Sequence, residues 1–136
     1  MSHGGNLRVL ILLLVMLFSI TCVAGSVVIK LSSNEAEDLG LVVQKNAEGN
    51  FLASIPSTID NCMVVSLETM LLEDDAVILH SELANTSDSH NSYSSYIIFD
   101  PLSAYDLFLG ARFKCKGNPT RYYDFGSFKK LMNILK

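Results

Sequence analysis

Residues 118–135 read NPTRYYDFGSFKKLMNIL, and this stretch carries the strongest structural pattern in the chain. Asn118 followed by Pro119 is typical of a helix start, with a capping side chain and then proline at the first helical position. Apolar side chains recur after it every three or four residues, which places them on one helix face. The residues of this face are Tyr122, Phe125, Phe128, Met132 and Leu135. The stretch predicts a terminal amphipathic helix, with only Gly126 against it.

Three earlier segments carry weaker helical patterns. Residues 26–45 place apolar side chains close to one face. Residues 60–83 hold the best apolar run before the tail, and Asp60 or Asn61 can cap it. Residues 101–110 form a short segment that opens with proline. Three or four helices predict an all-α four-helix bundle with long crossover connections, in which the third helix is short or irregular.

The first 25 residues have the features of a secretory signal peptide. Arg8 lies before an unbroken apolar run, Val9–Phe18, and small residues occupy positions −3 and −1 of a cut after Gly25. The run is shorter than the roughly 20 residues of a membrane-spanning helix. An uncleaved anchor is the alternative. We expect cleavage, secretion and a single extracellular domain over residues 26–136.

The cysteine count fits an oxidising compartment. Removal of the signal takes Cys22 away and leaves Cys62 and Cys115, and an even pair in a secreted chain is expected to form a disulfide. Asn85-Thr86-Ser87 is a glycosylation sequon, so this segment is predicted to be an exposed loop.

Charge is distributed very unevenly along the chain. The net charge of −4 argues against nucleic acid as a partner. Residues 26–110 hold 13 of the 14 acids, whereas seven cations and one acid lie from Ala111 onward. Two interpretations remain open: a basic terminal element that packs beside acidic ones, or a basic patch that faces a receptor or a glycosaminoglycan.

No catalytic arrangement is apparent in the sequence. His80, Asp88 and His90 match no zinc spacing, and the chain has neither a nucleophile elbow nor a phosphate loop. We therefore predict a binding protein without cofactor or metal, not an enzyme.

The order of four stretches resembles the short-chain four-helix cytokines of the interleukin-2, interleukin-15 and interleukin-21 family. Residues 36–39 resemble the acidic-then-leucine run of a first helix. Residues 51–62 resemble a connection from an aromatic residue through proline to a cysteine that opens the second helix. Cys115 is placed like the partner of that cysteine. Residues 115–135 resemble the family's ending, most closely over residues 127–134.

The resemblance implies a monomeric, secreted lymphocyte growth or activation factor. Its receptors would contain the common gamma chain and a beta-type chain. An acid on the first helix, Glu35 or Asp38, would contact the beta-type chain, and Asn133 on the last helix would contact the gamma chain. The family's shared disulfide corresponds to Cys62 and Cys115.

The alternative is a different secreted binding module, an inhibitor or carrier stapled by one disulfide. That interpretation fits if residues 96–116 form strands, and Tyr96 to Phe99 has strand-like composition. A small secreted enzyme ranks third, since no converging site is found.

Overall fold

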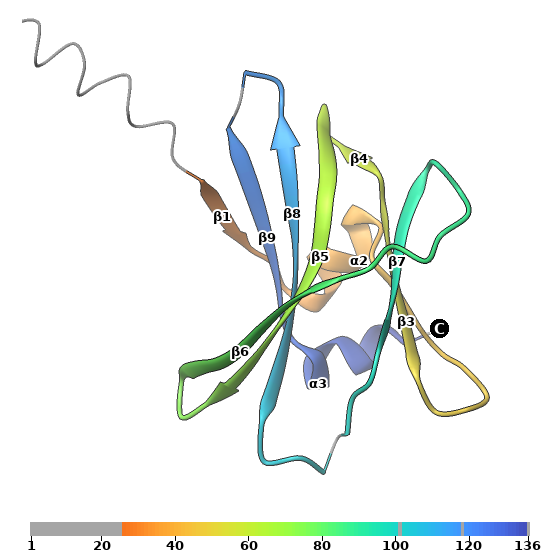
Figure 1. The fold of residues 1–136 in the computed structure, drawn as a ribbon, viewed down its shortest axis with the longest axis vertical. Coiled ribbons are helices and arrows are strands. Elements are labelled where there is room, and N and C mark those ends of the chain that lie inside the picture. The colour runs from red at the N-terminus through yellow and green to blue at the C-terminus, as the bar shows by residue number, and fades with distance from the viewer. Residues whose placement is uncertain (1–25, 101, 118, 136) are drawn as a thin grey trace, which may run out of the picture.

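The computed structural model describes residues 26–100, 102–117 and 119–135, and the predicted signal peptide lies outside them. Most of this chain forms β-strands, with two short α-helices and one 3-10 turn (Figure 1). In this part of the chain, no helix reaches the length and apolarity that crossing a membrane requires. The elements are β1 Val27–Lys30, α2 Ser33–Leu39, β2 Val42–Lys45, β3 Phe51–Pro56, β4 Thr58–Ile59, β5 Cys62–Glu73, β6 Ala76–Leu83, β7 Ser92–Ile97, β8 Asp106–Cys115, β9 Thr120–Ser127, α3 Phe128–Leu131 and the 3-10 turn η1 Met132–Ile134.

Two sheets make up the fold. The larger sheet has the order β1-β9-β8-β5-β4, and β6 pairs with the second half of β5. It curls into a half-barrel (Figure 1). β1 runs parallel to β9, and the other pairs in both sheets are antiparallel. The smaller sheet has the order β2-β3-β7. α3 packs against β8 and β9, while η1 packs against α2 and β2, so the end of the chain links the two sheets.

The core lies on the inner face of the larger sheet. Alternate residues of β8 and β9 point into it, as expected for strands with one buried face. Phe128 is fully buried and packs edge-on against Phe51 and Phe99, with ring centroids 5.2 Å and 4.9 Å away. Burial of a phenylalanine side chain contributes about 1.5–3 kcal/mol. This aromatic cluster therefore connects α3, β3 and the chain after β7.

α2 is a short helix with well-defined ends. Ser32 caps it: its hydroxyl accepts a hydrogen bond from the Glu35 amide, and the Glu35 carboxylate accepts one from the Ser32 amide. The helix ends at Gly40, whose φ of 111° places it where L-amino acids are strained. A Cβ built on Gly40 would lie 2.7 Å from Cγ of Pro56.

Gly40→Ala should therefore lower stability by more than the roughly 1–2 kcal/mol of backbone strain alone, because the added methyl group collides with Pro56. Gly49→Ala is the matched control: its φ is also positive, at 85°, but no atom lies within 4 Å of the added carbon. Urea unfolding of both variants measures the difference. Equal midpoints would show that the contact with Pro56 costs nothing.

The all-α prediction and the four-helix cytokine resemblance are wrong. Within residues 26–45 only Ser33–Leu39 is helical, and strands lie on either side of it. Residues 60–83 contain β5 and β6 in a hairpin, and the second half of the segment 101–110, from Asp106 on, belongs to strand β8. Of the terminal stretch, Thr120–Ser127 is a strand, and helix begins only at Phe128.

Strand alternation explains the terminal stretch better than helical spacing does. Tyr123 and Phe125 are buried, while Tyr122 and Asp124 point to the other face. Gly126, with a φ of 84°, adjoins a bulge where β9 slips against β8. Pro119, where the helix was expected to start, instead directly precedes β9, and Asn118 lies outside the described residues.

The predicted Cys62–Cys115 disulfide is confirmed. It joins directly opposed residues of β5 and β8, with 4.0 Å between the two Cα atoms, and does not join helices. The bridge therefore staples the two central strands of the larger sheet at one end.

Candidate functional site

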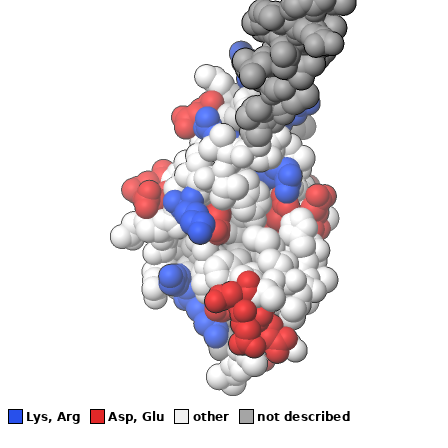
Figure 2. All heavy atoms as spheres, turned by 90° about the vertical axis from the view of Figure 1, so that its left-hand side faces the viewer, with Lys and Arg blue, Asp and Glu red and all other residues white. Residues whose placement is uncertain are grey.

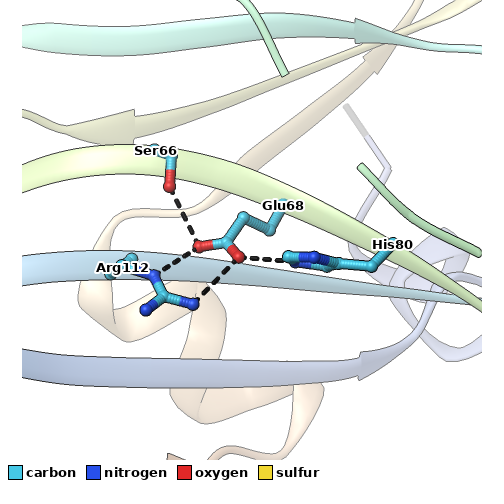
Figure 3. Close-up of polar contacts among 4 residues, drawn as sticks. All are labelled: Ser66, Glu68, His80 and Arg112. Carbon is cyan, nitrogen blue, oxygen red and sulfur yellow. Dashed lines mark hydrogen bonds and ion pairs between the residues drawn. The ribbon is translucent and has the colours of Figure 1, made fainter. Parts of the chain in front are cut away.

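A fully buried carboxylate lies at the centre of the larger sheet. Glu68 of β5 is on the face that points away from the core, and side chains from β5, β6 and β8 converge on it (Figure 3). Its Oε2 accepts hydrogen bonds from Ser66 Oγ at 2.9 Å and from Arg112 Nε at 2.9 Å. Its Oε1 accepts from Arg112 Nη2 at 3.2 Å and contacts His80 Nε2 at 2.6 Å.

These contacts keep the carboxylate ionised. Burial by itself raises the pKa of Glu68, but the hydrogen bonds from Arg112, Ser66 and His80 and the charge of Arg112 outweigh it, so the pKa is lowered. An ionised carboxylate only accepts hydrogen bonds. His80 Nε2 is therefore the donor, and both carboxylate oxygens already have two partners. Glu68 is a poor candidate for a catalytic base.

Tyr122 of β9 completes the cluster. Its hydroxyl is buried without a hydrogen-bond partner among the described residues. Burial and the charges of Glu68 and Asp124, opposed by Arg112, raise the pKa of Tyr122 to about 12. The hydroxyl end of the ring lies over Gly110, where a Cβ would come within 2.0 Å of the hydroxyl oxygen. Glycine is therefore needed at position 110, because a larger residue would prevent the tyrosine ring from lying across β8.

The cluster borders a pocket of about 350 Å³. Apolar side chains from three strands, Val28, Met70 and Val77, also line it. The charged groups of the cluster are hydrogen-bonded to one another, which limits the reactions that they could catalyse. Among the residues that the structure describes, no group of three or more His, Cys, Asp or Glu residues is arranged to hold a metal ion. The arrangement is suited to joining β5, β6 and β8.

A second hollow lies on the inner side of the sheet, between the β5–β6 hairpin and residues 98–100 and 103–105. This apolar groove holds about 350 Å³. It is lined by Thr69, Leu71, Leu79, Ser81, Ile98, Phe99, Asp100, Ser103, Tyr105 and Leu107. Like the Glu68 pocket, where Val28 and Val77 are 59% and 55% exposed, it is bordered by apolar side chains that remain largely in water. Ile98 is 86% exposed and Leu79 is 53% exposed, and Leu102, which precedes the lining residue Ser103 in the chain, is 92% exposed.

The residues predicted to contact receptors lie elsewhere. Glu35 and Asp38 are exposed on α2, where Glu35 serves in the helix cap. Asn133 is exposed on η1, which packs against α2. These elements are not the first and last helices of a bundle. The helix arrangement from which the receptor contacts were inferred therefore does not apply to this fold. Asn85 lies in an exposed loop between β6 and β7, and its glycosylation stays a prediction.

The basic end of the chain partly packs beside acidic strands, as one of the two interpretations held. Arg112 pairs with Glu68, and Arg121 lies 3.8 Å from Asp60. Lys129 and Lys130 remain exposed on α3. Binding of a glycosaminoglycan to this basic segment stays a prediction.

Comparisons with protein-family models, with curated proteins and with solved structures find no match to this chain. The function of the protein must therefore be inferred from the two sites themselves. Sequence reasoning singled out neither. Glu68 had one signal, a single acid inside a long apolar run, but its partner Arg112 is 44 positions away.

Proposed function

We propose that the protein is a secreted binding module that holds a partner protein against the apolar groove. The carrying observation is the gathering of exposed apolar side chains around one hollow, from β6 and from the segment after β7. Exposed apolar patches of this kind mark interaction surfaces in water-soluble proteins. This proposal keeps the secreted binding module and drops the four-helix cytokine.

A protein partner fits the groove better than an enclosed small molecule. Sites for small ligands bury most of the ligand's surface. Here Ile98 and Leu102 project into solvent, so a broad partner surface is needed to cover them. A typical interface has such an apolar centre surrounded by polar residues.

The surroundings of the groove favour a basic partner. Residues 46–111 contain no lysine or arginine. Glu73, Asp74 and Asp75 form the tip of the β5–β6 hairpin, and Asp100 lines the groove. Acidic side chains gather low on the side of the molecule from which this hairpin projects (Figure 2). Complementary charge raises association rates and excludes acidic partners.

Leu79→Lys tests the proposal. The full sequence is expressed in cultured animal cells, where we expect a secreted chain that begins at Ser26. A displayed library of random peptides is then selected for binding to the purified secreted protein. Selected peptides should bind the Leu79→Lys variant at least about tenfold more weakly, because a charge replaces an apolar anchor. Their enriched residues should be apolar and basic. Fluorescence polarisation of labelled peptides measures the affinities.

Met63→Lys is the matched control, since Met63 is also an exposed apolar strand residue, at 65%, but lies outside the groove lining. It should leave peptide affinity unchanged. The proposal fails if the peptides bind Leu79→Lys as well as the unaltered protein. It also fails if native mass spectrometry shows a small apolar molecule retained by the secreted protein and lost in Leu79→Lys, since this result would favour a carrier.

A further inference from the structure

We infer that β6 takes up the partner as an added β-strand, an inference that rests on the proposed function. Strand β6 pairs with β5 along one edge. In the part of the chain that the structure describes, no strand pairs with its other edge. Alternate backbone N–H and C=O groups of an edge strand point away from the sheet, so they are free to pair with an extended chain.

This edge lacks most of the devices by which proteins block strand addition. Those devices include lysine, proline, shortness, a covering element and a β-bulge. β6 has one of them, a bulge at Ile78, where its pairing with β5 shifts between Leu71–Leu79 and Leu72–Val77. The eight residues of β6 read AVILHSEL, with neither lysine nor proline. Val77, Ile78 and Leu79 are 55%, 49% and 53% exposed. At the far end of β6, the hydroxyl of Tyr93 donates to the Leu83 carbonyl and so covers that end.

The two faces of β6 also lead into the two hollows. Leu79 and Ser81 line the apolar groove, whereas Val77 and His80 line the pocket over Glu68. Beyond the bulge at Ile78, from Leu79 onward, a strand added beside β6 would send its side chains alternately to the two faces. Its groove-facing residues would be apolar, which gives the partner a period of two in its recognised residues.

Charge selects a basic segment of another protein over a second copy of this chain. The strand is bounded by the acidic turn Glu73–Asp75 and by Glu82. Antiparallel pairing of two copies about Leu79 would set Ala76 of one opposite Glu82 of the other, directly beside that acidic turn. Glu82 of one copy would then lie next to Asp75 of the other, and the repulsion between such neighbouring like charges opposes pairing. Lysine or arginine near the ends of the added segment would be attracted instead.

N-methylation of the selected peptides tests this mode of binding. Each backbone nitrogen of one Leu79-dependent peptide is methylated in turn, which removes one donor and adds bulk at the edge. We expect about tenfold weaker binding at every second position and little change between them. Hydrogen exchange of the complex should show newly slowed amides at alternate residues of β6.

Two outcomes would overturn strand addition while leaving the proposed function intact. One is a peptide that needs Leu79 but tolerates methylation throughout or loses affinity at helical spacings. The other is sedimentation of the free protein as a dimer with β6 amides already protected, which would make a second copy the occupant. Peptides that bind independently of Leu79 would instead defeat the proposed function, so the two failures are distinguishable.

Discussion

Arg112→Leu should lower the free energy of unfolding by about 3 kcal/mol at neutral pH. Removing one partner of a buried ion pair typically costs 3–5 kcal/mol, because the remaining charge is left without compensation. The lower end applies because the Arg112 side chain is 41% exposed, while that of Glu68 is fully buried. Urea unfolding followed by circular dichroism measures the change.

A second variant separates the ion pair from simple packing. Glu68→Leu/Arg112→Leu removes both charges and should regain much of the lost stability, since apolar replacement of a whole buried pair is often neutral. Lys114→Leu is the control for loss of a cation on the same strand, because Lys114 is exposed. A double variant as unstable as Arg112→Leu would show that the unpaired Glu68 carboxylate is not the cause.

The pH dependence should reverse between the two proteins. Because the pKa of Glu68 is lowered in the folded protein, its contribution is present above the ordinary glutamate value of 4.5 and is lost as pH falls through the lower folded pKa. In Arg112→Leu, burial dominates and raises the pKa of Glu68 above that value. The variant should then lose stability as pH rises through the raised pKa. Parallel pH profiles of the two proteins would contradict this account.

Cys62→Ser/Cys115→Ser should lower the free energy of unfolding by about 4 kcal/mol. The bridge closes a loop between residues 53 positions apart, and chain entropy gives about this value for such a loop. For a small domain this is a large share of the total stability. The expected result is a much lower urea midpoint, and dithiothreitol should shift the unaltered protein by the same amount. An unchanged midpoint in both experiments would show that the bridge adds no stability.

The disulfide was predictable, because cysteine count and compartment do not depend on fold. The strands were not, because the apolar residues of β5 satisfy two periods at once. Leu67 and Leu71 are four apart, which suits a helix, yet with Thr69 between them they also alternate along one face of a strand. The spacing of these residues therefore does not distinguish a helix from a strand.

The turn residues held the missing signal. Asp60-Asn61 and Asp74-Asp75 all have positive φ, between 49° and 64°, as tight hairpin turns between twisted strands require. Asn and Asp tolerate that conformation better than most residues. The first pair was interpreted as a helix cap, a role for which the same side chains are suited. Two such pairs at the ends of one apolar run indicate hairpins on both sides of it.

The Glu68 cluster could not be predicted from the sequence, for a different reason. Its members are separated by 12 and 44 positions, and only strand register brings them together. A shift of one residue would turn Arg112 to the other face of the sheet. The sequence shows that acidic and basic residues are concentrated in different segments, but it does not show which charged side chains contact one another.

The pairing of β1 with β9 has a consequence for how the molecule is completed. The first strand, Val27–Lys30, finds its neighbours at Arg121 to Asp124. Since synthesis runs from the amino end, β1 cannot pair with β9 until residues 121–124 have been made, 94 positions later in the chain. Contacts this distant in sequence form slowly. Loss of β9 would therefore leave β1 without its neighbour, and this edge of the sheet can form only after residues 121–124 have been translated.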